Sequence, residues 1–207
     1  MMRRWGLPLA IVLCALAGVA VKMGLLQGRL GLYQLRYFTT LSNLLAAGCA
    51  LRALIRGRQG YGTVKGLALL CVLITCGVYH TLLAGTFGGF PLFSLDWWGN
   101  QLVHTIVPVL TLLDYVLFDP KGQLSRYCPL IWLAAPCGYF CFTVVMAHMG
   151  ILFPHSSTAY PYPFLDVWRL GWGPVARNAA LLAAGFLLLG CGLTALDRWL
   201  GRRAYFS

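Results

Sequence analysis

Residues 64–84 read VKGLALLCVLITCGVYHTLLA, and Lys65, at the start of the run, is the one Lys, Arg, Asp or Glu that it contains. A helix needs roughly 20 mostly apolar residues to cross about 30 Å of hydrocarbon. The run therefore predicts a membrane-spanning helix. Five further runs of the same kind complete a set of six predicted spans: 5–26, 37–55, 64–84, 100–118, 130–149 and 175–196.

The composition of the whole chain agrees with this prediction. The 207 residues are 59% hydrophobic and 10% charged, with a mean hydropathy of +0.74, whereas about a quarter of the residues in a soluble domain are charged. We find no long linker and no internal repeat, so we expect one all-α domain, residues 1–207, built as a polytopic bundle of six transmembrane helices.

The basic residues predict how this bundle is oriented. The net charge is +11, but the bases flank apolar runs, which is typical of membrane topology rather than of nucleic-acid binding. With a cytoplasmic N-terminus, eleven of the sixteen Lys and Arg lie inside, and five lie outside: Lys22, Arg29, Arg36, Arg169 and Arg177. Because cytoplasmic loops are enriched in Lys and Arg, we expect the N and C termini to be cytoplasmic.

Hydrogen-bonding side chains gather at one depth, the outer third of the predicted bilayer. A lone Ser or Thr in a span usually bonds the preceding turn, and a lone His usually bonds a neighbouring helix. Intramembrane polar groups are costly unless paired, however, and so many together indicate a cavity that opens outward. The set comprises Thr39, Thr40, Ser42, Asn43, His80, Thr81, Asn100, Gln101, His104, Thr105, His148, Arg177 and Asn178.

The outer loops are rich in aromatic residues, which allows two interpretations. Trp and Tyr favour the headgroup zone, so these rings fit an ordinary interfacial belt. They also fit a mouth that admits a lipid-like molecule from the outer leaflet. The rings are Phe87, Phe90, Phe93, Trp97 and Trp98 in one loop, and Tyr160, Tyr162, Phe164, Trp168 and Trp172 in another.

Within the polar set, Thr39 and His104 suit nucleophilic chemistry. A hydroxyl becomes a nucleophile when a base takes its proton, and neutral His is the usual base near pH 7. At 1.5 Å per residue the two lie within about 3 Å of one another in depth. Asn43 and Asn100 lie one turn from them and are able to orient the base or stabilise an oxyanion. Asp114 is about 15 Å deeper than His104 and is a poor third member.

Three stretches of this sequence carry a family resemblance: RYFTTLSN at 36–43, NQLVHTIVP at 100–108 and YPFLD at 162–166. In this order they resemble the signatures of the six-helix family that contains the androgen-induced and androgen-dependent membrane hydrolases, and the chain is most similar to its bacterial branch. The resemblance implies a Thr/His hydrolase in a bacterial inner (cell) membrane. In animal members the substrates are fatty acid esters of hydroxy fatty acids.

Carried over by motif, the resemblance implies Thr39 as nucleophile and His104 as base. Because Thr40 directly follows Thr39, the choice between these two hydroxyls stays open. The YPFLD stretch marks an outer loop, and Tyr162 joins the supporting residues. The expected partners are membrane lipids and a lipid-like substrate.

Two other classes of function remain as alternatives. The first is a transporter or binding protein for lipids or small molecules that performs no chemistry. Against it, we recognise no intramembrane acid–base relay of the kind transporters show. The second is a haem-binding electron-transfer protein that uses His80, His104 and His148. No cluster has the spacing of metal ligands, so we expect neither a metal site nor a cofactor.

Overall fold

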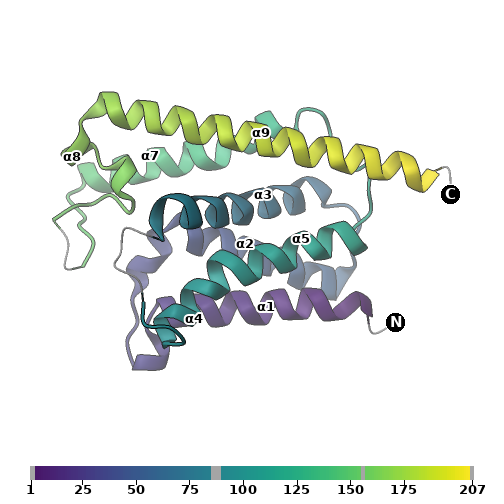
Figure 1. The fold of residues 1–207 in the computed structure, drawn as a ribbon, viewed down its shortest axis with the longest axis horizontal. Helices are drawn as coiled ribbons and strands as arrows, with labels where there is room; N and C mark the ends of the chain where they lie inside the picture. The colour runs from purple at the N-terminus through teal and green to yellow at the C-terminus, as the bar shows by residue number, and fades with distance from the viewer. Residues whose placement is uncertain (1–2, 85–89, 155–156, 206–207) are drawn as a thin grey trace. The chain divides into compact units, whose positions relative to one another are not determined.

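The computed structural model describes residues 3–84, 90–154 and 157–205, and every regular element in this part of the chain is a helix (Figure 1). The prediction for Phe87 falls outside these residues. Six of the helices are long and apolar enough to cross a membrane: Trp5–Lys22, Phe38–Arg56, Gly62–Leu83, Leu95–Phe118, Cys128–His148 and Trp172–Arg202. The prediction of an all-α polytopic bundle with six spans is therefore confirmed, and the chain is an integral membrane protein.

The chain forms two compact units. Unit 1 comprises Met1–Leu124 and Leu196–Ser207, and unit 2 comprises Ser125–Ala195. The principal helices of unit 1 are α1 (Arg3–Lys22), α2 (Phe38–Arg56), α3 (Gly62–Val78), α4 (Leu95–Gln101) and α5 (Val107–Phe118). Two short 3₁₀ turns, η1 (Leu25–Gln27) and η2 (Leu32–Arg36), lie between α1 and α2.

Two π-helical turns interrupt the spans of unit 1. The turn η3 (Tyr79–Leu83) continues α3, and η4 (Leu102–Ile106) joins α4 to α5. A π turn adds one residue to the local helical repeat and so changes the direction of the side chains that follow; such turns are frequent at functional sites. Both turns carry a histidine, His80 in η3 and His104 in η4.

Local signals explain where the predicted spans differ from the observed ones. The first span ends at Lys22 rather than at residue 26, because Gly24 adopts a left-handed φ of 76°. The fourth begins at Leu95 rather than at residue 100, because the Ser94 side chain accepts a hydrogen bond from the Trp97 backbone N–H at 3.2 Å and caps the helix.

Small residues let the helices of unit 1 approach one another closely. One core cluster takes its buried side chains from α1, α2, α3 and α5: Ile11, Ala15, Ala46, Ala47, Ala50, Val72 and Val107. A Cβ added at Gly18 of α1 would lie 2.7 Å from Val103 of η4, and one at Gly99 of α4 would lie 2.6 Å from Val21 of α1. The two glycines thus allow α4 and η4, the turn that carries His104, to pack closely against α1.

Unit 2 contains α6 (Cys128–Trp132), α7 (Ala134–His148), η5 (Pro163–Leu165), α8 (Val167–Leu170) and α9 (Trp172–Tyr205) as far as Ala195. Ala147, Ala159 and Tyr160 form its buried cluster. Gly190 of α9 lies against Pro129 and Trp132, where a Cβ would be 3.3 Å from the Pro129 Cβ. A glycine therefore provides the close contact between α9 and α6.

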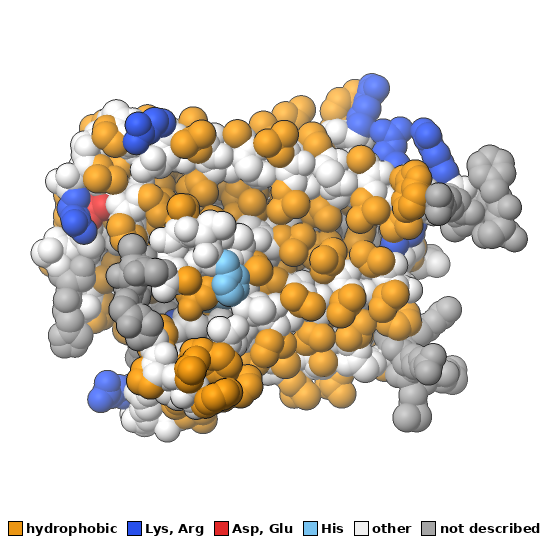
Figure 2. Space-filling view, viewed as in Figure 1, with side chains coloured by type: hydrophobic (Ala, Val, Ile, Leu, Met, Phe, Trp, Pro, Cys, Tyr) orange, Lys and Arg blue, Asp and Glu red, His pale blue; other side chains and the backbone are white. Residues whose placement is uncertain are grey.

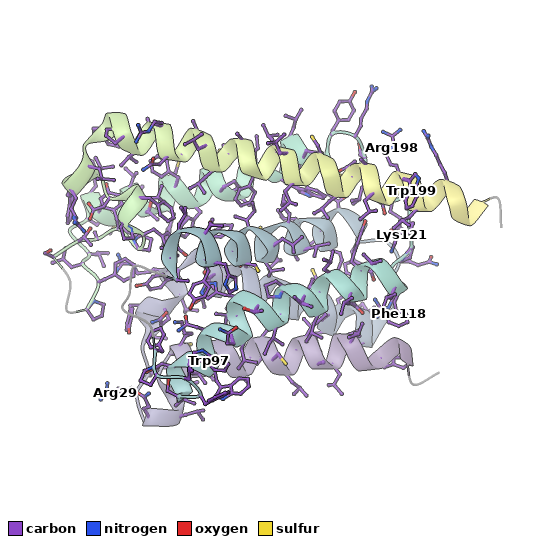
Figure 3. The ribbon with its side chains drawn as sticks, viewed as in Figure 1. Arg29, Trp97, Phe118, Lys121, Arg198 and Trp199 are labelled. Carbon is purple, nitrogen blue, oxygen red and sulfur yellow. The ribbon has the colours of Figure 1, made fainter. Side chains whose placement is uncertain are left out.

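Unit 1 has two ends of different character. Arg29 and Trp97 lie at one of them, hereafter the Trp97 end, whereas Phe118, Lys121, Arg198 and Trp199 lie at the other, the Lys121 end (Figure 3). Figure 2 shows a face covered mainly by hydrophobic side chains, with Lys and Arg near its edges. This distribution suits helices whose sides contact lipid and whose ends contact water.

Candidate functional site

His104 lies in a packed environment toward the Trp97 end of unit 1. It is 6% exposed, and its ring stacks on Tyr79 of η3 with centroids 4.1 Å apart and planes inclined by 10°. It also forms a hydrogen bond with the backbone of Thr75. Its Nδ1 is buried and has no hydrogen-bond partner among the described residues. The ring is thus held in place while one nitrogen keeps its hydrogen-bonding capacity unused.

Asn43 links the turn that carries Thr39 to the backbone beside His104. Its Nδ2 donates to the Thr39 carbonyl oxygen at 2.9 Å and to the Val103 carbonyl oxygen at 3.0 Å. The second carbonyl belongs to the peptide that joins Val103 to His104. Asn43 is completely buried. The two segments that resemble family signatures, 36–43 and 100–108, are therefore in direct contact.

The structure records no hydrogen bond between the Thr39 hydroxyl and His104 among the described residues. Thr39 is half-buried and Thr40 is buried. Ser42 donates to the Phe38 carbonyl oxygen at 2.7 Å, the bond that a serine in a span commonly makes to its own helix. Of these hydroxyls, Thr39 lies one helical turn before Asn43 and so shares its face.

A second set of polar contacts surrounds His80. Its Nε2 lies 3.0 Å from the Thr105 hydroxyl oxygen, and that hydroxyl donates to Gln101 Oε1 at 2.9 Å. His80 is exposed on the surface of the chain, unlike His104. The contacts join η3 to η4, so each of the two π turns holds the other through both a ring stack and a hydrogen bond.

The Asn100 side chain forms hydrogen bonds with Lys22 and Asp96 rather than with Thr39 or His104. Its Oδ1 accepts a hydrogen bond from Lys22 Nζ at 2.9 Å, and its Nδ2 donates to the Asp96 carbonyl oxygen at 2.9 Å. Lys22 Nζ also lies 5.8 Å from the centre of the Phe90 ring. Asn100 therefore anchors the last residue of α1 to α4.

The remaining predicted residues, His148, Tyr162, Arg177 and Asn178, belong to unit 2. His148 ends α7 and is exposed, as is Arg177. Asn178 Nδ2 donates to the Phe164 carbonyl oxygen at 2.9 Å, and Tyr162 stacks on Phe164 with centroids 5.3 Å apart. Within unit 2, Asn178 thus contacts the loop that contains the YPFLD stretch, and Tyr162 stacks on Phe164 inside that stretch.

The Lys121 end contains a buried charge cluster, formed by Arg58, Lys65, Asp114 and Asp119. Asp114 accepts hydrogen bonds from both terminal nitrogens of Arg58, at 3.0 and 2.7 Å, and from Lys65 Nζ at 2.7 Å. Asp119 accepts one from Arg58 at 2.7 Å and lies 3.2 Å from Lys65 Nζ. Side-chain exposure is 0% for Asp114, 2% for Lys65 and 13% for Arg58. Two cations thus neutralise two carboxylates away from water.

Arg58 of the cluster and two neighbouring loop residues, Tyr61 and Lys121, have pKa values that are shifted from their ordinary values. Burial lowers the pKa of Arg58, but hydrogen bonds to Asp114 and Asp119 outweigh it, and the pKa lies above its ordinary value. Burial raises the pKa of Tyr61 and lowers that of Lys121. Arg58 and Tyr61, with Asp197 and Gln123, line a small pocket that has room for about one water molecule.

This cluster places an acid–base pair inside the spans, where the sequence indicated no acid–base relay. Lys65 and Asp114 both lie within observed spans and are bonded to each other. From the sequence, Arg58 and Lys65 were interpreted only as basic residues that orient the spans. A usable signal was present in the sequence, because three of the five acidic residues lie in or just after the cytoplasmic ends of predicted spans: Asp114, Asp119 and Asp197.

Two other contact residues of the site, Tyr79 and Lys22, were also missed. The sequence pattern did not single out Tyr79, and Lys22 was counted only as a base on the outer side. A signal for Tyr79 was its position next to His80 in the polar layer. Within the described residues, no group of three or more His, Cys, Asp or Glu side chains is arranged to hold a metal ion.

Comparison of the chain with protein-family models, with curated proteins and with solved structures finds no match.

Proposed function

We propose that the protein is a membrane-embedded hydrolase of lipid esters in which Thr39 is the nucleophile and His104 the base. The observation that carries this proposal is the environment of His104: a buried imidazole held by Tyr79 and by the Thr75 backbone, with Nδ1 unbonded among the described residues. Asn43 adds support because it ties the turn of Thr39 to the peptide before His104.

The chemistry would proceed through an acyl-enzyme. His104 Nδ1 takes the Thr39 proton as the hydroxyl oxygen attacks the ester carbonyl carbon, and the proton then passes to the leaving alcohol. The positive N-terminal end of α2, whose first turn carries Thr39, would stabilise the developing oxyanion. Hydrolysis of the acyl-threonine regenerates the hydroxyl.

The substrate class and location follow from the family resemblance and are part of the proposal. The substrates are lipid esters, with esters of hydroxy fatty acids as the first to test. The chain lies in a bacterial cell membrane with Thr39 and His104 toward the outer leaflet. Its partners are membrane lipids and the lipid-like substrate.

A fluorophosphonate probe tests the proposal on protein purified in detergent. We expect labelling of wild type and of Thr39→Ser, and its loss in Thr39→Ala and His104→Ala. Thr40→Ala decides between the adjacent hydroxyls. Thr111→Val is the matched control, because the Thr111 hydroxyl is buried but bonds its own helix at Val107. Full labelling and ester hydrolysis by both alanine variants would disprove the assignment.

The charge cluster favours one competing function, a lipid transporter. Intramembrane ionisable residues commonly mark ion or proton pathways, and Lys65 and Asp114 form such a pair. In liposomes that contain a fluorescent phospholipid, a transporter would move the lipid between leaflets, lose this activity in Asp114→Asn and keep it in Thr39→Ala. A hydrolase of the proposed kind shows the opposite dependence on Thr39.

A further inference from the structure

Asn43 has one group whose role the proposed hydrolase does not yet explain. Both neighbours of its amide nitrogen are carbonyl oxygens, those of Thr39 and Val103. Since a carbonyl oxygen only accepts hydrogen bonds, both N–H groups of Asn43 are used. Its Oδ1 is left as a pure acceptor, buried and without a partner among the described residues. Asn43 therefore has no hydrogen left to donate to an oxyanion.

His104 Nδ1 is a second buried atom without a described partner, and it belongs to the residue that follows the peptide bonded by Asn43. The ring hydrogen-bonds the Thr75 backbone, while Nδ1 is buried and unpartnered in the described part of the chain. In a neutral imidazole with its hydrogen on the other nitrogen, Nδ1 accepts. Asn43 is bonded to the very peptide that precedes His104. Two buried acceptors thus belong to side chains that the Val103–His104 peptide connects, and buried acceptors need donors.

We propose that Asn43 Oδ1 and His104 Nδ1 together bind the water molecule that hydrolyses the acyl-Thr39 intermediate. Water fits because it carries two O–H donors, one for each acceptor, and keeps its lone pairs for attack. The inference rests on the proposed function. It assigns Asn43 to the second half of the reaction and excludes it as an oxyanion donor.

Deacylation adds water to the acyl carbon and releases the Thr39 oxygen. The water oxygen bonds to the acyl carbon while His104 Nδ1 takes one water proton and Asn43 Oδ1 accepts a hydrogen bond from the other. The bond between the acyl carbon and the Thr39 oxygen then breaks, and His104 returns its proton to that oxygen. The products are a carboxylic acid and free Thr39.

The experiment uses the full-length protein in detergent with p-nitrophenyl laurate. Release of nitrophenolate and the intact mass of the protein are followed together in wild type, Asn43→Leu and the control Thr111→Val. Asn43→Leu loses the acceptor, so we expect one stoichiometric burst, an adduct of one acyl group and a steady-state rate lower by about tenfold or more. Thr111→Val should turn over as wild type does.

Asn43→Asp is the second variant, because it keeps two acceptor oxygens and loses both donors. We expect it to accumulate no adduct, whatever its acylation rate. If Asn43→Leu does not fold, a stalled adduct in Asn43→Asp overturns the inference.

Two results distinguish failure of the inference from failure of the proposed function. If wild type turns over through Thr39 and His104 but Asn43→Leu loses acylation and deacylation equally, Asn43 only supports the fold and the water assignment is wrong. If wild type neither hydrolyses the ester nor forms an adduct, the hydrolase proposal itself fails.

Discussion

His104 and His80 are two histidines on facing π turns, yet their surroundings differ. His104 is buried against Tyr79, whereas His80 is exposed and contacts the Thr105 hydroxyl. A general base requires a nitrogen that is able to accept a proton, and the buried Nδ1 of His104 has no partner among the described residues. The residue type alone did not separate the two, since both lie in the predicted polar layer.

Tyr79 should control how well the His104 ring is positioned. Replacing it with Leu removes a stack worth about 0.5–1.5 kcal/mol, so we expect slower fluorophosphonate labelling at unchanged probe binding. Tyr79→Phe keeps the ring and should label as wild type does. The rate constant and the half-saturating probe concentration, measured separately, check this. Equal labelling of Tyr79→Leu and Tyr79→Phe would show that the stack is irrelevant.

Asp114 should be the most sensitive residue of the charge cluster. Asp114→Asn leaves two cations, Lys65 and Arg58, with Asp119 as the one remaining carboxylate of the cluster, where side-chain exposure is 2% and 13%. Removing one member of a buried ion pair costs about 3–5 kcal/mol, so thermal unfolding in detergent should occur at markedly lower temperature.

The apolar replacement Lys65→Met with Asp114→Leu removes both charges together and should recover part of that loss. If the double variant is less stable than Asp114→Asn, the destabilisation does not come from an unpaired charge.

At the scale of helices, the contact between α1 and η4 depends on two glycines. Gly18→Ala and Gly99→Ala would each place a Cβ within 2.7 Å of Val103 or Val21, and such overpacking costs about 1–3 kcal/mol. Gly48 of α2 has no heavy atom within 4 Å of an added Cβ, so Gly48→Ala should stabilise its helix by about 0.5–1 kcal/mol. Unfolding temperatures of the three variants test this order.

Hydropathy and charge predicted the six spans because each follows from about 20 consecutive residues. The same patterns could not predict the π turns at Tyr79–Leu83 and Leu102–Ile106. Packing between spans determines which carbonyl oxygen accepts the hydrogen bond of each backbone N–H there. The depth of Asn43 and His104 was predictable from helix rise. Asn43 donates both of its N–H groups to backbone carbonyl oxygens. This pairing depends on which helices are neighbours, and the sequence of a single span does not specify its neighbours.

For the molecule as a whole, the basic residues predict that both termini are cytoplasmic. Green fluorescent protein fused after Ser207 should fluoresce, and alkaline phosphatase fused after Trp98 should be active, because each matures on only one side of the membrane. Reversal of charge at Arg52 and Arg56, which lie outside the cluster, should lower both signals. An active phosphatase fused at the C-terminus would contradict the predicted orientation.

The charge cluster also connects membrane insertion of the chain with the packing of the folded protein. Arg58 and Lys65 are synthesised before Asp114 and Asp119, so the predicted orientation implies that during insertion they act as uncompensated positive charges that retain their loop in the cytoplasm. Once the fourth span has entered, the two carboxylates pair with them. In the predicted orientation the same two side chains serve first as a topological signal and later as members of an internal ion pair, with Lys65 buried and Arg58 half-buried in the finished protein.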